Sequence, residues 1–505
     1  MNTTHQPTIW MNVSTSAGWN RPAVGIVRVE LELCAQLAKL YGKRFRQCRW
    51  QGDRFIDCTP PAALAAASPV PPQGAAPVPA PPASDPSLPA PQPILPPIYP
   101  LLPRRLALKN LAQAVFSLTP AALRPYFNRF LYALRPRAAA LVGRWHLRRK
   151  AAGLPPLHMP PGALPPPQGE QPCHMGALFA PGDVLLAIGA EWHFPYYSQL
   201  YHLRQQRQIK VITCCYDLIP VLYPQYCLAD VARIFSAYFL ELADASDLIL
   251  CISRQSQADL HALLERTGAA QPRTHVFALG DQLPAAQQDP CSEVITQLCQ
   301  QPFILFVSSI ERRKNHEVLY RAYHLLCAAG KAASLPKLVF VGMNGWGVAD
   351  LLHDIDLDPL TAGLIVRLNH VTDAELQQLY QAALFCVYPS LYEGWGLPVG
   401  EALAMGKVVL SSDRGSLPEV GGDLVRYLDP WSPQLWADEI ERMSFDAGWR
   451  QAWEHKVQTR YQVRTWADAA RSVQQAIDTL LLPQPPQPTP APHCASVNTS
   501  ISASV

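Results

Sequence analysis

The chain has 505 residues, 49% of them hydrophobic, which is enough for two or three domains with cores of their own. Its 42 Lys and Arg nearly balance its 39 Asp and Glu, and this balance excludes a generally basic nucleic-acid-binding surface. No apolar run reaches the ~18–20 residues of a membrane-spanning helix, and the opening MNTTHQPTIW has neither the basic nor the apolar region of a signal peptide. The 13 cysteines include no CxxC pair, which favours buried reduced thiols in the cytosol over a disulfide framework.

Short apolar strands alternate with helices on both sides of an unusual segment, 59–172. Near the N-terminus the pattern predicts a strand over 8–13 and a helix over 27–40. After the unusual segment it predicts four more strands, over 183–189, 209–213, 247–252 and 275–279. Short continuous apolar strands separated by helices are typical of a parallel sheet that is covered on both faces.

The segment 59–172 differs from the rest of the chain in composition. Seventeen of the 51 prolines fall between Pro60 and Pro103, which predicts a solvated polyproline II spacer. The next segment, 104–150, has eleven Lys and Arg but no Asp or Glu, and its apolar residues recur at spacings of three and four. Two interpretations stay open: short amphipathic helices that adsorb to an anionic membrane face, or a helical insertion that packs on its own domain.

Beyond residue 300 the alternation becomes regular. Strands are predicted over 303–308, 337–342, 364–369, 384–389 and 407–412, and helices over about 315–329, 373–382 and 398–405. Thr372 and Glu375 have the spacing of a capping box before the second of these helices. An amphipathic terminal helix is predicted over 463–482, with a disordered tail after it.

The predicted fold class is α/β, with two doubly wound, Rossmann-like domains and a cleft between them. Five parts are assigned: an N-terminal domain, an insertion in it, a C-terminal domain, a helix that packs back on the first domain, and the tail. In that order they cover residues 1–58 with 173–285, 59–172, 286–460, 461–482 and 483–505. Ligands of doubly wound folds bind at the carboxyl ends of the strands, so the site is expected in the cleft.

One strand–loop–helix segment, residues 388–406, carries the most specific pattern. Glycine lets the backbone of the loop approach a ligand closely, and the first helical turn is a favoured position for proline. The free N–H groups at such a helix start, together with the helix dipole, bind phosphate or diphosphate. The loop and the helix start consist of Gly394, Trp395, Gly396, Leu397 and Pro398.

Charged side chains flank this loop. Glu393 precedes it and Glu401 lies one turn into the helix, so the two carboxylates can contact one ligand at different points along its length. Arg312, Arg313 and Lys314 follow the first strand of the same domain, and we expect them to face the cleft and neutralise a diphosphate. For Glu393 the alternative is a loop carboxylate that caps the helix. For the three cations the alternative is an exposed cluster at a helix start.

These residues resemble the family 4 glycosyltransferases, which have the two-domain fold called GT-B. EGWGLPVGE, residues 393–401, matches the E-x7-E signature of that family. The resemblance is nearly continuous from about 303 to 425 and is weaker in the first half. There, three segments are similar to the acceptor-side domain: GIVRVELELCAQL, YDLIPVLYP and DLILCISRQSQADL. Within the family the chain looks most like mannosyl- and rhamnosyltransferases of surface-polysaccharide assembly.

The resemblance implies a role for each matched position of the C-terminal domain. Glu401 resembles the glutamate that holds the ribose hydroxyls of the nucleotide sugar, and Glu393 resembles the one that contacts the donor sugar. Lys314 and Arg313 resemble the cations on the diphosphate, to which the glycine loop would add backbone N–H donors. Val371 falls where the backbone of relatives meets the nucleobase.

On the acceptor side the resemblance points to Gly25 and Arg28, in the loop before the first helix; for Arg28 a plain solvated helix residue is the alternative. Asp217 follows a strand where many relatives have His-Asp, but Tyr216 precedes it here. Ser308 stands where many relatives carry an arginine, so another cation would have to replace it or diphosphate binding would differ. Three polar residues are predicted to cap and surface a helix rather than take part in chemistry: Ser253, Ser256 and Asp259.

The family implies a retaining hexosyltransferase in which the leaving diphosphate deprotonates the acceptor hydroxyl. A nucleotide-diphosphate sugar is the expected co-substrate and a glycan or lipid-linked glycan the expected acceptor, with no cofactor, metal or nucleic acid. Asp354 and Asp356 mimic a metal-binding DxD, but we predict that they lie in a polar segment between helix and strand. The alternatives are a non-catalytic GT-B scaffold and a GT-B nucleotide-sugar epimerase or phosphorylase. The expected location is the cytoplasm or the inner face of the plasma membrane.

Overall fold

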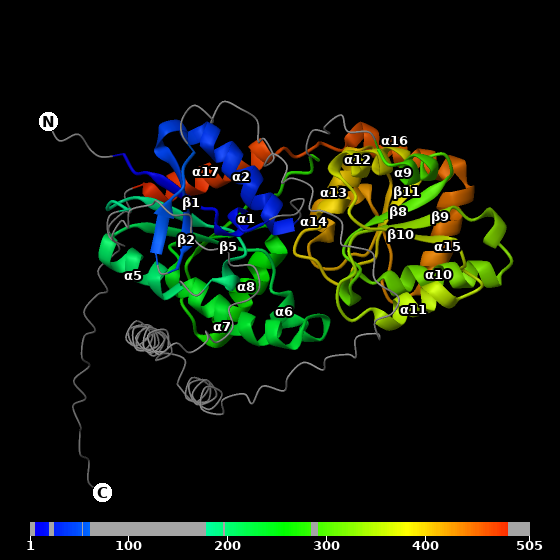
Figure 1. The fold of residues 1–505 in the computed structure, drawn as a ribbon, viewed down its shortest axis with the longest axis horizontal. Helices are drawn as coiled ribbons and strands as arrows, with labels where there is room; N and C mark the ends of the chain where they lie inside the picture. The colour runs from blue at the N-terminus through cyan, green and yellow to red at the C-terminus, as the bar shows by residue number, and fades with distance from the viewer. Residues whose placement is uncertain are drawn as a thin grey trace, which may run out of the picture.

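A computed structural model shows the fold. It describes residues 6–19, 25–52, 54–60, 178–194, 197–283 and 291–482. The predicted proline-rich spacer, the basic segment 104–150 and the predicted tail from 483 lie outside the described residues. The described residues form two α/β halves that lie side by side (Figure 1).

The N-terminal half is built on a seven-stranded sheet in the order β3-β2-β1-β4-β5-β6-β7. All neighbours are parallel except β2 and β3, which form an antiparallel hairpin at one edge. This is the strand order of a Rossmann fold with one strand added. The strands are β1 (Ile9–Asn12), β2 (Phe45–Gln51), β3 (Arg54–Asp57), β4 (Val184–Ala187), β5 (Lys210–Cys215), β6 (Leu248–Cys251) and β7 (Arg273–Val276).

Helices cover this sheet, and the last helix of the chain returns to it. The N-cap of α8 is Ser253, whose hydroxyl accepts from the backbone N–H of Ser256, as the sequence predicted. α17 (Trp466–Leu481) begins with a capping box and packs against α2. The other helices are α1 (Ser14–Ala17), α2 (Gly25–Tyr41), η1 (Gly42–Arg44), η3 (Glu191–His193), α5 (Tyr197–Arg207), α6 (Ile219–Leu222), η4 (Pro224–Tyr226), α7 (Ala229–Ala245) and α8 (Arg254–Thr267).

The C-terminal half has a six-stranded, all-parallel sheet in the order β10-β9-β8-β11-β12-β13. It repeats the Rossmann order, so the predicted α/β class with two doubly wound sheets is confirmed. Its strands are β8 (Phe303–Val307), β9 (Lys337–Val341), β10 (Ile365–Leu368), β11 (Phe385–Tyr388), β12 (Val409–Ser411) and β13 (Arg426–Tyr427). Its helices are α9 (Glu293–Leu298), η5 (Arg312–Lys314), α10 (His316–Ala328), η6 (Ala332–Ser334), α11 (Ala349–Leu357), α12 (Asp373–Ala382), α13 (Leu397–Ala404), α14 (Leu417–Gly421), η7 (Gly422–Leu424), α15 (Pro433–Phe445) and α16 (Ala447–Arg460).

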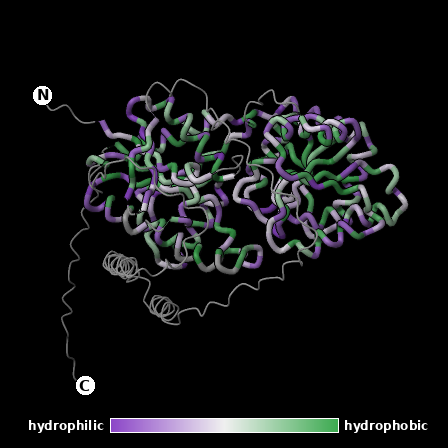
Figure 2. The backbone as a smooth tube through the Cα atoms, viewed as in Figure 1, coloured by the Kyte–Doolittle hydropathy of each residue, from purple (hydrophilic) through white to green (hydrophobic). Residues whose placement is uncertain are grey.

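The core of the C-terminal half lies around its strands. Phe303, Phe306, Phe340 and Phe385, on β8, β9 and β11, are all fully buried. Figure 2 shows hydrophobic backbone at the centre of this half and more hydrophilic backbone on its outside. Thr372 and Glu375 form the predicted capping box at the start of α12. Within the part of the chain that the structure describes, no helix is both long and apolar enough to cross a membrane.

Two carboxyl groups are buried at the carboxyl ends of β1 and β4. Glu30 accepts from the backbone N–H of Ser16 at 2.7 Å, and Glu191 accepts from the Asn12 amide at 3.2 Å and from the Gly189 backbone at 3.1 Å. A Cβ built on Gly189 would lie 2.1 Å from a Glu30 oxygen, so both carboxyl groups adjoin this glycine. Burial raises the pKa of Glu30 to about 7, and burial together with the nearby Glu30 raises the pKa of Glu191 to about 8.

We expect these groups to make the folded state less stable as the pH rises. Both folded pKa values lie above the ordinary value of 4.5, so the unfolded chain releases these protons first. The stability that these two carboxyl groups give the folded state is therefore fully present below about pH 4.5 and is lost as the pH rises through about 7–8. Glu30→Gln removes one of these groups. The free energy of unfolding of this variant minus that of the wild type, measured with urea, should be larger at pH 8.5 than at pH 5.5 by on the order of 2–3 kcal/mol. The exposed Glu265→Gln serves as the control, and equal pH slopes for Glu30→Gln and wild type would contradict the assignment.

Candidate active site

The candidate site lies where β8 and β11 stand next to each other in the C-terminal sheet. The order of strands reverses at this pair, and such a switch point opens a crevice at the carboxyl ends of the strands. η5 follows β8 and the loop before α13 follows β11, so both segments reach this edge. In Figure 1, α10 and α11 lie on one side of the sheet and α12 and α13 on the other.

A buried ion cluster joins these two segments. Glu393 accepts from Lys314 Nζ at 2.5 Å, and its second oxygen lies 2.8 Å from Arg313 Nη1. Arg313 also pairs with Glu311 at 2.7 Å and donates to the backbone carbonyl of Tyr392 at 2.7 Å. Glu393 is 6% exposed and Glu311 is 3% exposed, so water screens these charges little. The structure thus places Glu393, Lys314 and Arg313 in one contact network.

The charges in this cluster set the protonation states. Burial alone would raise the pKa of Glu393, but the charges of Arg313 and Lys314 outweigh it and lower that pKa to about 2. Burial and the neighbouring Arg313 lower the pKa of Lys314. The pKa of Arg313 is raised in spite of burial, because Glu393 and Glu311 favour its charged form. Glu393 is therefore a carboxylate at neutral pH.

The glycine loop exposes backbone donors at the start of α13. Gly396 precedes this helix with φ at 116°, a conformation that favours glycine, and Pro398 lies in the first turn. Among the described residues, the backbone N–H groups of 394–397 have no hydrogen-bond acceptor. They are therefore available to an anion at the helix start. Trp395 is buried, and the Arg464 guanidinium lies 5.1 Å from its ring centre.

Glu401 connects the two halves of the molecule. Its Oε1 accepts from Arg28 on α2 at 2.7 Å, and its Oε2 accepts from the Tyr380 hydroxyl at 3.0 Å. Arg28 also donates to the backbone carbonyl of Gln282 and is only 7% exposed. The alternative of a solvated Arg28 is therefore wrong, and so is its placement in a loop, because it lies within α2. Burial raises the pKa of Glu401, and the charge of Arg28 opposes this effect.

The loop after β5 packs directly on the glycine loop. A Cβ added to Gly394 would lie 2.5 Å from the Tyr216 carbonyl oxygen and 2.8 Å from the Asp217 Cβ, so only glycine permits this approach. Ser256 donates to the same Tyr216 carbonyl at 2.9 Å. Asp217 accepts from a backbone N–H at the start of α6 at 3.0 Å. Burial raises the pKa of Asp217 and the charge of Arg313 opposes it, which places Asp217 close to the ion cluster.

Sequence reasoning missed several contacts that hold the glycine loop and the residues just before it. Ser416 donates to the backbone carbonyl of Glu393 at 3.0 Å. The Tyr392 hydroxyl donates to Asp259 at 2.6 Å, which gives Asp259 a role between the two halves beyond surfacing a helix. Glu419 accepts from two backbone N–H groups at the start of α8, each at 2.8 Å. The segment DRGSLPE, with its glycine and helix-start residues, was the one local signal for these contacts.

Other predicted residues lie outside the ion cluster. Val371 follows β10 at the edge of the sheet, and Gly25 begins α2 instead of preceding it. Arg312 is exposed and lines a groove beside α10. Asp354 and Asp356 lie inside α11, so the predicted polar segment between helix and strand is wrong there. Among the described residues no group of His, Cys, Asp and Glu side chains is placed to hold a metal ion.

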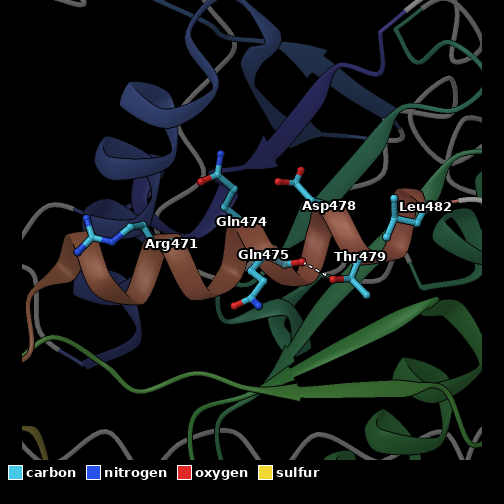
Figure 3. A pocket seen from close by; sticks show the side chains of 6 residues that line it. All are labelled: Arg471, Gln474, Gln475, Asp478, Thr479 and Leu482. Atoms are coloured by element: carbon cyan, nitrogen blue, oxygen red, sulfur yellow. Dashed lines mark hydrogen bonds between the residues drawn. The ribbon is translucent and has the colours of Figure 1, made fainter.

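A separate hollow of about 390 Å³ runs along α17. Figure 3 shows the side chains that line it, spread along this helix from Arg471 to Leu482, with Thr479 donating to the backbone carbonyl of Gln475 at 2.7 Å. It contains none of the predicted site residues. The ion cluster and the glycine loop therefore remain the candidate site.

Parts of the chain are similar in sequence to known proteins. Residues 295–460, most of the C-terminal half, match the family described as "Glycosyl transferases group 1". The chain is 31% identical over 244 residues to "O-antigen chain mannosyltransferase B" of Escherichia coli. The aligned region covers 48% of this chain and 63% of that relative. It is 24% identical over 311 residues to the "Serotype-specific mannosyltransferase WbdA" of Escherichia coli. This aligned region covers 59% of this chain and 37% of that relative. The chain therefore spans less than two thirds of these curated relatives.

Solved structures with a similar fold are more distant. The sucrose-phosphate synthase of Thermosynechococcus elongatus aligns with a TM-score of 0.45 and 21% identity, over 59% of this chain and 73% of that one. A likeness at this level adds nothing to the two strand orders. Those orders, with the family match, define a two-domain glycosyltransferase fold of the GT-B type.

Proposed function

We propose that the chain is a retaining glycosyltransferase that moves a hexose from a nucleotide-diphosphate sugar to a glycan or lipid-linked acceptor. The proposal is carried by the buried Arg313–Glu393–Lys314 cluster beside the free N–H groups at the start of α13. Cations and N–H donors that converge at a helix start are suited to a diphosphate leaving group.

Donor binding would redistribute charge within the cluster. Glu393 now balances Lys314 and shares Arg313 with Glu311. A diphosphate would bring negative charge to the two cations and so free Glu393 to accept hydrogen bonds from the hydroxyls of the donor sugar. The Tyr388 hydroxyl, which accepts from Lys314 at 2.9 Å, would keep that side chain in position during the exchange.

The nucleoside would lie toward α13 and β10. Glu401 receives one hydrogen bond on each oxygen, and a carboxylate oxygen has capacity for a second one. Ribose hydroxyls could therefore bind Glu401 without breaking its contact with Arg28. The family resemblance places the nucleobase near the backbone of Val371.

In this proposal the protein positions the reactants and stabilises charge on the leaving group. Lys314, Arg313 and the loop N–H groups supply the positive potential, so no cofactor or metal is proposed. The leaving diphosphate would take the proton from the acceptor hydroxyl on the same face of the sugar. Asp217 lies beside the cluster from the N-terminal half and would face the acceptor.

The relatives' names favour mannose as the donor sugar. The test is incubation of the protein with a panel of nucleotide sugars and a disaccharide acceptor, followed by mass spectrometry and by NMR of the new anomeric bond. The proposal predicts one added hexose with the anomeric configuration of the donor. A changed donor without an acceptor would instead identify an epimerase, and no conversion of any donor would favour a non-catalytic scaffold.

The basic segment 104–150 lies outside the described residues, and we propose that it binds an anionic membrane face. Eleven cations and no carboxylate would favour such a surface by roughly 1 kcal/mol for each basic residue near it. In flotation with phosphatidylserine vesicles, the full chain should float at low salt and a variant lacking 104–150 should stay at the bottom. Equal recovery of both proteins would show that the segment does not bind membranes.

A further inference from the structure

A groove of about 670 Å³ runs between α10 and α11 on the C-terminal half. This volume falls within the ~300–1,000 Å³ range of ligand sites. Arg312 and Gly347 line the groove at the carboxyl ends of β8 and β9, and Tyr320 and Asp354 line it further along the two helices. Arg312 is directly followed by Arg313 of the ion cluster, so η5 contributes to both places. The groove therefore begins at the edge of the candidate active site.

The lining side chains suit a neutral ligand with hydroxyl groups. Three carboxylates, of Glu317, Asp350 and Asp354, outnumber the guanidinium groups of Arg312 and Arg321. An anionic ligand is therefore disfavoured. Within the described ranges, the side chains of Arg312 and Asp350 have neither a hydrogen bond nor an ion pair, although the Arg312 backbone carbonyl accepts from the Asn315 N–H. Planar carboxylate and guanidinium groups can each bind two neighbouring hydroxyls, because they offer two acceptors or a fork of donors.

An exposed tryptophan directly precedes one of the residues that line this groove. Trp346 directly precedes Gly347 and is 40% exposed, although large apolar side chains are usually covered. Its indole N–H donates to the Tyr226 backbone carbonyl at 2.8 Å, so the ring is held in place. The apolar face of a fixed aromatic ring can pack on the C–H face of a pyranose.

Aromatic rings continue from this tryptophan toward the active site. Tyr226 stacks on Tyr223 with ring centres 5.7 Å apart, and Tyr223 lies 4.8 Å from the ring of Tyr392. Tyr392 directly precedes Glu393 and is joined to Arg313 through its carbonyl. Three tyrosine rings therefore lead from the ion cluster to Tyr226, whose backbone carbonyl holds Trp346 next to the groove residue Gly347.

From these observations we propose that the groove between α10 and α11 binds a neutral oligosaccharide, namely the sugar residues of the acceptor chain beyond the one that is glycosylated. Trp346 is the stacking platform, and Asp350, Asp354 and Arg312 bind hydroxyl groups. This proposal rests on the proposed glycosyltransferase function. It implies that longer acceptors bind more tightly than short ones, because only they reach the groove.

The test compares a disaccharide and a pentasaccharide of mannose as acceptors. In Trp346→Ala and Asp350→Ala, KM for the pentasaccharide should rise about tenfold, while KM for the disaccharide and kcat stay within about twofold. Phe445→Ala, which removes an exposed aromatic ring at the end of α15, is the matched control and should change neither value. Equal effects on both acceptors, or no effect on either, would overturn the proposal.

A binding measurement separates this proposal from the proposed function. Saturation-transfer NMR with the pentasaccharide alone needs no donor and no turnover, so it remains informative if no nucleotide sugar is a substrate. The signal should be strong for the wild type and for Lys314→Ala, and should be lost in Trp346→Ala. A signal that persists in Trp346→Ala and Asp350→Ala, or stronger binding of inorganic diphosphate than of the sugar in the groove, would contradict it.

Discussion

Lys314→Ala is expected to lower kcat/KM for sugar transfer by about 10²–10³-fold, which corresponds to about 2.7–4 kcal/mol of transition-state stabilisation. Lys314 is a cation of the buried cluster and would face the negative charge that develops on the leaving diphosphate. Because water is largely excluded there, no solvent dipole can replace the lost charge. Initial rates with a fixed acceptor and varied donor measure this effect.

The same substitution also disturbs a buried ion pair, so folding must be measured with it. Among the described cations, Glu393 would keep only Arg313 as an ion-pair partner, and breaking a buried pair costs about 3–5 kcal/mol in other proteins. Lys331→Ala is the matched control, since Lys331 pairs with Glu441 on the surface of the same domain. If Lys314→Ala were as active as Lys331→Ala at equal folded fraction, Lys314 would have no part in transfer.

Gly394→Ala is expected to reduce transfer by about 10²-fold or more, since small displacements of reacting groups have effects of this size. The new Cβ would lie 2.5 Å from the Tyr216 carbonyl oxygen, and a backbone atom cannot move aside as a flexible side chain can. The loop carrying Glu393 would have to move away from the N-terminal half. Steady-state kinetics and thermal unfolding of the purified variant measure both consequences.

Gly448→Ala on α16 is the control for this substitution, because a Cβ there would meet no atom closer than 3.5 Å. It should leave activity unchanged and raise helix stability slightly. Wild-type kinetics in Gly394→Ala would show that the close contact between the two loops is not needed for catalysis.

Most strands could be predicted because their burial leaves a simple pattern. A central parallel strand is covered on both faces, so FILFV and the LVFV that follows Lys337 read as uninterrupted apolar runs. The hairpin of β2 and β3 at one edge of the sheet was missed, because FRQCRWQ and RFID both mix polar and apolar residues. β13 was missed because it has only two residues.

The composition of the site was visible in the sequence, but its pairings were not. The glycine loop and its flanking carboxylates are local in the chain, so their spacing alone predicted a phosphate-binding helix start. The contact of Arg28 with Glu401 joins residues 373 positions apart, and nothing near either residue indicates the other. The support of Glu393 by Ser416 likewise depends on how β11 and β12 are paired.

Transfer by wild type and Glu393→Ala from a panel of nucleotide sugars, mannose donors included, tests the central claim most directly. Mass spectrometry of a disaccharide acceptor would report each added hexose, and circular dichroism would report the folded fraction. We predict hexose addition by the wild type with at least one donor and a loss of about 10²-fold or more in Glu393→Ala. Equal transfer by both proteins would contradict the assigned site, and no transfer with any donor would contradict the proposed activity.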